Sequence, residues 1–163
     1  MTRWHAMEPV DESFFEKAPY IYRFTYDLPV SPQRVWGSLD SDNSVADWTP
    51  LLSKITWTSP RPHGVGTTRE VLLPARAARI RENFFIWEDG HRFAFHGTEA
   101  TLPLFSHFAE DYLVEPSGTG TRFTWTFALE GTPRTRVLMK AMNPVNRLQF
   151  RQMSSGCKSY FAK

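Results

Sequence analysis

The sequence predicts an α+β fold in which a curved antiparallel sheet of about seven strands wraps around a long C-terminal helix. Segments rich in β-branched and aromatic residues alternate with short turns along most of the chain, and the final segment has a helical period instead. The 163 residues favour one domain with one hydrophobic core. We expect residues 1–18 to form an N-terminal extension that packs loosely on a single domain at residues 19–163.

The first strand and two short helical segments are predicted near the start of that domain. Residues 20–28, YIYRFTYDL, alternate and are rich in β-formers, which is typical of a strand. Ser31 is a good N-cap and Pro32 suits the first helical position, so a short helix follows. A second helical turn is expected over residues 43–48, and Pro50 ends it.

The middle of the chain reads as a run of strands joined by hairpins. Glu88-Asp89-Gly90 and residues 117–120, Ser-Gly-Thr-Gly, are clear turn signals between neighbouring strands. Hairpins predict antiparallel pairing. The expected strands are residues 54–58, 68–73, 78–87, 91–97, 106–116 and 121–131.

The last element is predicted to be a helix. Asn143 followed by Pro144 is a capping residue and first-turn pair, which predicts a helix from there to near the C-terminus. Residues 133–142 look helical too, with Pro144 as a break or kink. Apolar residues recur at steps of three and four on one face, namely Phe150, Met153, Cys157 and Phe161.

Composition excludes several classes of protein. A net charge of +2 argues against a dedicated nucleic-acid binder. No apolar run is long enough for a membrane span, and the N-terminus has no signal-peptide pattern, so we expect a cytoplasmic protein without stable membrane insertion. The five histidines and the lone Cys157 lack metal-ligand spacing, and no cofactor motif is present. We therefore expect neither metal nor cofactor, and a monomer or weak homodimer.

A series of short motifs gives the chain a family resemblance. SPQRVWGSL follows the first strand, DWTPLL follows the short helices, and GVGTTREV, RENFFIWEDGHRFAF and EDYLVEPSGTGTRFTWTF come in order after them. Over roughly residues 20–162 the sequence resembles the SRPBCC or START-like helix-grip superfamily, in its polyketide cyclase/dehydrase-like branch. The resemblance implies a deep apolar cavity between sheet and helix, with activities that range from lipid carriage to aromatase or cyclase chemistry.

Strand parity indicates which residues would line such a cavity. If Trp125 and Phe127 face the helix, the inward set on other strands includes Phe108, Val114, Ile80 and Ile86, and Trp48 and Leu51 lie at the rim. The rim position would explain the apolar stretch DWTPLLSKITWTS at residues 47–59. The predicted ligand-binding residues are Trp48, Leu51, Arg69, Glu82, Phe84, Phe93, Phe95, Glu110, Tyr112, Trp125, Phe127, Phe150 and Met153.

Two of these residues, Glu82 and Glu110, would place carboxyl groups on the inner face of the sheet. A carboxylate there needs a partner or a raised pKa, and Arg69 on a neighbouring strand is a candidate partner. The pair could anchor a ligand or act as a general acid or base. Structural ion pairs and solvent-facing carboxylates remain alternatives.

Three functions follow from this interpretation. The favoured one is the binding of a hydrophobic small molecule, such as a lipid, fatty acid or polyketide-like aromatic, because no nucleophile–base pair of recognisable spacing is present. A cyclase, aromatase or dehydratase that uses the same cavity without metal is the first alternative. A protein-interaction module is the second, and it would have a filled cavity and an exposed apolar patch. The identity of the catalytic residues stays open.

Overall fold

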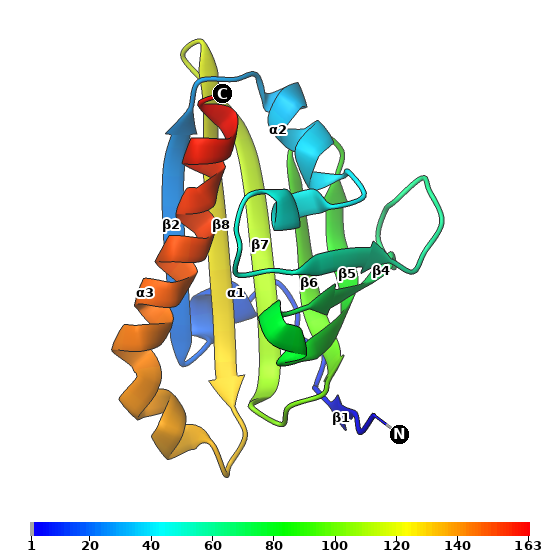
Figure 1. Cartoon of the computed structure of the whole chain (residues 1–163), viewed down its shortest axis with the longest axis vertical. Coiled ribbons are helices and arrows are strands. Elements are labelled where there is room, and N and C mark those ends of the chain that lie inside the picture. Colours follow the sequence, from blue (N-terminus) through cyan, green and yellow to red (C-terminus); the bar gives the residue numbers. More distant parts are fainter. Residues whose placement is uncertain (1) are drawn as a thin grey trace.

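The computed structural model describes residues 2–163 and shows an open antiparallel sheet with a long helix across its concave face (Figure 1). The helices are α1 (Phe14–Lys17), α2 (Pro32–Leu39) and α3 (Arg136–Phe161), with short 3₁₀ turns η1 (Ser44–Asp47) and η2 (Pro74–Arg76). The strands are β1 (His5–Ala6), β2 (Tyr20–Leu28), β3 (Lys54–Trp57), β4 (Thr68–Leu72), β5 (Arg79–Glu88), β6 (Arg92–Ala100), β7 (Phe105–Ser117) and β8 (Gly120–Gly131). The predicted fold class is confirmed.

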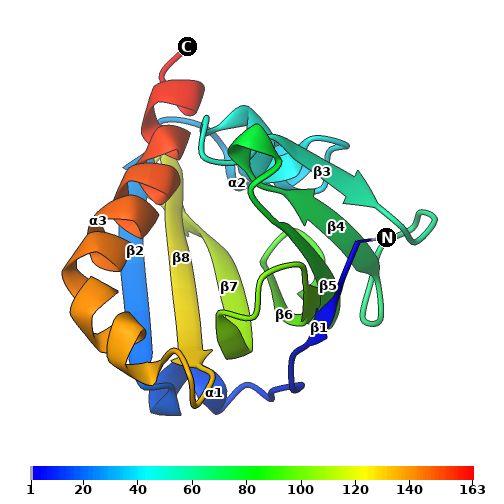
Figure 2. The same ribbon diagram turned by 60° about the horizontal axis from the view of Figure 1, so that its bottom comes forward.

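The sheet curves around α3. Its strand order is β2-β8-β7-β6-β5-β4-β3, with β1 attached to β6. Every neighbouring pair is antiparallel, so hairpins join all strands from β3 to β8, and α2 and η1 carry the chain from β2 to the far edge. In Figure 2, α3 lies along β2 and β8, while β3, β4 and β5 stand away from it on the opposite side. This asymmetry leaves room between the helix and the far strands.

The start of the C-terminal helix differs from the prediction. The helix begins at Arg136 and runs without interruption through Pro144, so Asn143 is not its N-cap. Pro144 has no N–H to donate to the carbonyl of Lys140, and the axis of α3 bends over its first half (Figure 1). The long helix tolerates one lost hydrogen bond because its inner face stays packed on the sheet.

The parity of β5 also differs from the prediction at one position. Phe84 pairs with Phe95 but Ile86 pairs with Ala94, so Phe85 is an extra residue in a β-bulge. The bulge shifts the alternation by one residue. Ile86 therefore lies on the outer face of the sheet with Phe85, and Trp87 turns inward to pack on Phe93.

The N-terminal extension packs tightly rather than loosely. Phe15 of α1 is 3% exposed and lies on the outer face of the sheet against Ala94, Ala109 and Ala128. Small residues on three adjacent strands make a shallow seat that one phenyl ring fills. At the other end of the extension, Met7 lies so close to Gly97 that a Cβ there would overlap it. Helix α1 therefore covers part of the outer face of the sheet, whereas Met7 belongs to the main hydrophobic core.

A dense aromatic core fills one end of the space between the sheet and the helices. Trp48, Tyr112, Phe123, Trp125 and Phe161 are buried there. Their rings pack edge to face or tilted at centroid distances of about 5 to 6 Å. Gly156 lets α3 approach the Trp48 carbonyl, since a Cβ at that position would overlap the carbonyl oxygen.

Candidate functional site

A cavity of about 480 Å³ occupies the other end of the space between the sheet and α3. The cavity is lined by α3, by β3 and β4 with the segments that flank them, by the inner faces of β5 and β7, and by the loop before β7. Its lining is almost entirely apolar. The lining residues are Val45, Leu51, Leu52, Ile55, Arg69, Val71, Leu73, Pro74, Ala77, Ile80, Glu82, Leu104, Phe105, Phe108, Glu110, Tyr112, Leu138, Met139, Met142, Asn146, Gln149, Phe150 and Met153.

One corner of the cavity is polar, and a buried ion pair forms part of this polar corner. Arg69 on β4 and Glu82 on β5 are direct partners in the sheet, and Arg69 Nε donates to Glu82 Oε2 at 2.6 Å. Arg69 Nη1 also donates to the buried hydroxyl of Ser44 at 3.4 Å, and its guanidinium lies over the rings of Phe84 and Phe95. The aromatic faces and the carboxylate together replace the water that this cation has lost.

A second carboxyl group, that of Glu110 on β7, lies in the same corner. Its Oε2 accepts hydrogen bonds from Tyr112 Oη at 2.6 Å and from Trp125 Nε1 at 2.8 Å. Within residues 2–163, Oε1 has no hydrogen-bond partner, whereas every fully enclosed side-chain nitrogen or oxygen in that range has one. Oε1 of Glu110 therefore retains access to the space of the cavity.

Burial sets the protonation states in this corner. Burial raises the pKa of Glu110 to about 8, and the nearby Glu82 carboxylate adds to the shift, against the hydrogen bonds from Tyr112 and Trp125. Burial also raises the pKa of Glu82, although the guanidinium of Arg69 opposes that shift. Burial lowers the pKa of Arg69, but the nearby Glu82 carboxylate raises it by more, so the pKa lies above its ordinary value. At neutral pH the corner thus holds one ion pair and one largely protonated carboxyl, with no net charge.

The cavity opens where α3 begins. Leu138 on the first turn of α3 and Leu104 on the loop before β7 both line the cavity and are 51% and 36% exposed. Ala77, beside η2, is another exposed lining residue. The mouth therefore lies between the first half of α3 and the η2 segment, at the end of the cavity away from the aromatic core.

The structure separates the predicted site residues into two groups. Seven line the cavity: Leu51, Arg69, Glu82, Glu110, Tyr112, Phe150 and Met153. Six do not line it and belong to the buried core instead: Trp48, Phe84, Phe93, Phe95, Trp125 and Phe127. Contact of either group with a ligand stays a prediction.

The second group faces inward as strand parity predicts but lies outside the cavity lining. Trp48 in particular is only 5% exposed, so it is a core residue and not part of a rim. Its ring packs on Phe123 and Phe161, and its Nε1 donates to Ser38 Oγ at 2.9 Å. The alternation of side chains along a strand predicts which face of the sheet a residue lies on. It does not predict where along the strand the packed core ends and the cavity begins.

Sequence reasoning missed most of the lining that α3 contributes. Leu138, Met142, Asn146 and Gln149 follow one another at steps of three and four, in register with the predicted stripe from Phe150 onward. The signal was present in residues 133–142, which already looked helical. Placing the start of the helix at Asn143 concealed it. The lining residues Pro74, Ala77 and Leu104 lie in or beside the η2 turn and in a loop, where no periodicity marks them.

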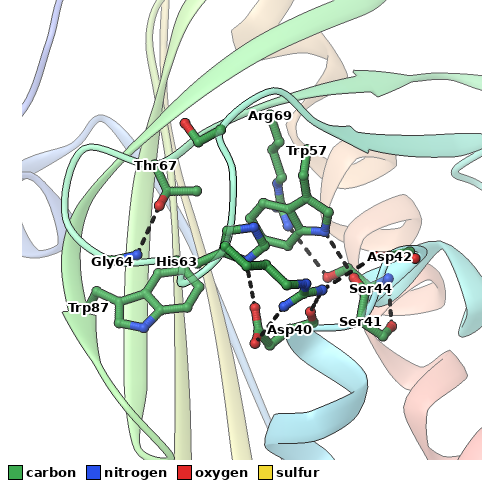
Figure 3. Close-up of polar contacts among 12 residues, drawn as sticks. Asp40, Ser41, Asp42, Ser44, Trp57, His63, Gly64, Thr67, Arg69 and Trp87 are labelled. Atoms are coloured by element: carbon green, nitrogen blue, oxygen red, sulfur yellow. Dashed lines mark hydrogen bonds and ion pairs between the residues drawn. The ribbon is translucent and has the colours of Figure 1, made fainter.

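A separate polar cluster fixes the loop between β3 and β4, and Figure 3 shows it beside Arg69. His63 Nδ1 lies 2.6 Å from Asp40 Oδ1, and its ring stacks on Trp57 with the centroids 4.1 Å apart. Arg61 also donates to the Asp40 carboxylate, at 2.9 Å. These contacts tie the loop to the end of α2. His63 is not among the residues that line the cavity.

Two further features bear on the chemistry of the chain. Among residues 2–163, no group of three or more His, Cys, Asp or Glu side chains could hold a metal ion. In the same range, no helix has the length and apolar character needed to cross a bilayer.

Comparison with known proteins agrees with this architecture. Residues 22–161 match the model of a family described as polyketide cyclase / dehydrase and lipid transport. Uncharacterized proteins of Mycobacterium tuberculosis and Mycobacterium bovis are 34% identical over 154 residues, which is 94% of this chain and 91% of each relative.

Solved structures extend the likeness at the level of the fold. A START superfamily protein from Mycobacterium smegmatis aligns with a TM-score of 0.71 at 8% identity, over 87% of this chain and 97% of that one. A point mutant of norcoclaurine synthase from Thalictrum flavum, in complex with a transition-state analogue, aligns with a TM-score of 0.62 at 15% identity, over 88% of this chain and 94% of that one. Both likenesses concern the fold alone.

Proposed function

The chain belongs to the polyketide cyclase / dehydrase and lipid transport family, and from this premise we propose that it binds one hydrophobic small molecule in the cavity between the sheet and α3. The observation that carries the proposal is the cavity itself, about 480 Å³ with apolar walls and one buried polar corner. This volume lies within the range of about 300–1,000 Å³ typical of small-molecule sites, and a few convergent polar groups in an apolar pocket are the usual arrangement.

The polar corner favours a neutral ligand over an anionic one. The positive charge of Arg69 is already compensated by Glu82 at 2.6 Å, and Glu110 is largely protonated at neutral pH. A ligand carboxylate would bring an uncompensated charge into this buried corner, at a high cost in desolvation. The ligand best suited to the cavity is therefore mostly apolar, with one uncharged polar group such as a carbonyl or hydroxyl.

Glu110 is the anchor in this proposal. Its Oε2 already accepts from Tyr112 and Trp125, so the proton of the neutral carboxyl resides on Oε1, which has access to the cavity. An O–H there donates a hydrogen bond to a carbonyl oxygen of the ligand. The amides of Asn146 and Gln149 line the same cavity and offer further hydrogen bonds from the helix side.

The test is isothermal titration calorimetry with three ligands of one chain length: a fatty acid, the fatty alcohol and a methyl ketone. The alcohol and ketone are expected to bind with one-to-one stoichiometry and more tightly than the acid at pH 7. Met142→Trp, which fills part of the cavity from α3, should abolish binding, whereas Gln152→Trp on the exposed face should not. Equal binding to both variants would place the ligand elsewhere and overturn the proposal.

A second candidate function is acid–base catalysis on a carbonyl compound. The observation that favours it is a carboxyl with a pKa of about 8 and one oxygen open to an apolar cavity, since perturbed pKa values are common among catalytic groups. The predicted reaction is removal of a proton next to a ketone, followed by deuterium exchange in D₂O. NMR should then show exchange of an aromatic methyl ketone that increases as the pH rises through about 8, levels off above it, and is lost in Glu110→Gln. Exchange at the same rate in the variant would exclude this function for Glu110.

A further inference from the structure

The C-terminal segment has a charge pattern unlike the rest of the chain. Residues 132–163 contain seven Lys or Arg and no Asp or Glu, whereas the net charge of the whole chain is only +2. The remaining 131 residues therefore carry a net charge of −5. None of the seven cations forms an ion pair within residues 2–163, and all are exposed. This segment is an uncompensated basic surface on an otherwise acidic molecule.

Large apolar side chains are exposed on the same surface. Apart from Val65, every large exposed hydrophobic residue of the described chain lies on α3 or on the loop before β7. These residues are Leu102, Leu104, Val137, Leu138, Val145 and Leu148. Val137 and Leu148 are 83% and 65% exposed, so neither contributes much to the core. A hydrogen bond from Thr135 Oγ1 to the Leu104 carbonyl, at 2.7 Å, holds the loop against the start of α3.

The two kinds of residue form adjacent stripes along α3. Lys140, Arg147 and Arg151 recur at steps of seven and four, which places them on one side of the helix. Val137, Val145 and Leu148 fall on the side next to it, between the basic stripe and the cavity-lining Leu138 and Met142. The apolar stripe thus borders the mouth of the cavity, and the basic stripe lies beyond it.

We propose that this surface, residues 102–104 with the outer face of α3 over residues 136–151, docks the protein on an anionic lipid bilayer. Cations that flank exposed aliphatic side chains match a surface of negative headgroups over hydrocarbon. A duplex nucleic-acid site needs the cations but not the aliphatic stripe, and a single-stranded one would have exposed aromatic side chains in place of it. The proposal of membrane docking is argued from the exposure and charge of these residues alone, and it does not depend on the proposed ligand binding. Only the consequence that a ligand enters the mouth from the membrane depends on that function.

The test is sedimentation with vesicles of phosphatidylcholine alone and of phosphatidylcholine mixed with phosphatidylglycerol. The full chain is expected to bind the mixed vesicles at low salt and to dissociate from them at high salt. It should not bind vesicles of phosphatidylcholine alone. Lys140→Glu with Arg151→Glu should lower the partition coefficient about tenfold or more. Val137→Ser with Leu148→Ser removes the exposed aliphatic side chains and should weaken binding without changing the net charge of the surface.

The matched control is Arg34→Glu with Arg122→Glu, which makes the same change in net charge on exposed residues of α2 and β8. These positions lie at the opposite end of the molecule from the start of α3 (Figure 1). The control should keep vesicle binding within about twofold of wild type. An equal loss in control and stripe variants would mean that overall charge alone drives binding and would overturn the proposal, as would failure of the wild type to bind mixed vesicles at low salt.

A parallel titration with duplex DNA separates the two polyanions. DNA binding that is as strong as vesicle binding, and insensitive to Val137→Ser with Leu148→Ser, would contradict a lipid surface. Because Val137 and Leu148 do not line the cavity, their variant should bind a soluble ligand as the wild type does. Failure of ligand binding in the wild type would overturn the proposed function and leave the docking result standing.

Discussion

Arg69 and Glu82 form an ion pair at 2.6 Å with side chains that are 1% and 3% exposed, at the edge of a cavity with apolar walls. Such a pair is costly to bury and still more costly to break, because each partner compensates the charge of the other. The sheet register imposes it, since the two residues are direct neighbours on β4 and β5. Its presence gives the cavity a polar corner without net charge.

Breaking this pair on one side should destabilise the protein strongly. Glu82→Gln leaves the Arg69 guanidinium buried without a charged partner, and the expected loss in unfolding free energy is about 3–5 kcal/mol. The double variant Arg69→Met with Glu82→Leu should recover most of that loss. Urea denaturation of the single and double variants measures both effects. A single variant within about 1 kcal/mol of wild type would show that the corner is more hydrated than the burial of these side chains indicates.

Glu110 should make stability depend on pH. Its pKa is about 8 in the folded protein against an ordinary value of 4.5, so the folded state holds the proton that the unfolded state releases between these values. The free energy of unfolding should therefore fall as pH rises from about 5 to about 8, by an amount on the order of a few kcal/mol.

Glu110→Gln removes this titration. The stability of the variant relative to wild type should therefore increase from pH 5 to pH 8, by the amount that the wild type loses over that range. Glu8→Gln, at an exposed residue outside any ion pair of the described chain, is the control and should follow the wild type. Thermal melts at the two pH values give the comparison. Parallel curves for wild type and Glu110→Gln would mean that Glu110 is ionised throughout.

Phe15 should contribute to stability as a core residue does. Phe15→Ala removes the ring that fills the seat made by Ala94, Ala109 and Ala128, and we expect a loss of about 3 kcal/mol or more. Phe14→Ala, at the half-buried neighbour, should cost clearly less. Equal and small effects in chemical denaturation would mean that the N-terminal extension detaches before the sheet unfolds.

The Asp40 carboxylate should hold the β3–β4 loop in place. Asp40→Asn removes the negative charge that both Arg61 and His63 contact, so the loop loses its attachment to the end of α2. We expect amide hydrogen exchange to become faster at Gly64 and Gly66, with little change in β7 and β8. Exchange that stays at the wild-type rate would assign the order of the loop to the Trp57–His63 stacking instead.

The predictable part of this structure is the part governed by local periodicity. The alternation in β7 and β8 correctly placed Glu110, Tyr112, Trp125 and Phe127 on the inner face, because an uninterrupted strand keeps its parity. In β5 the same reasoning failed at Ile86, because a single extra residue at Phe85 reverses every side chain after it. No feature of the sequence marks that bulge.

The position of the cavity was harder to predict than its existence. Trp48 and Phe95 fill the core while Leu51 and Phe150 line the open space, and all four are apolar or aromatic residues in inward positions. The difference arises from long-range geometry, namely how far β3 to β5 curve away from α3. The tight seat of Phe15 is likewise created by three alanines on different strands, which only the folded sheet brings together.

The most direct test of ligand binding is native mass spectrometry of the wild type, Met142→Trp and Gln152→Trp after incubation with the same fatty alcohol, methyl ketone and fatty acid. We predict one bound molecule of alcohol or ketone on the wild type and on Gln152→Trp, and none on Met142→Trp. An unliganded wild type with every compound, or equal adducts on all three proteins, would contradict the proposal that the cavity between the sheet and α3 is a ligand-binding site.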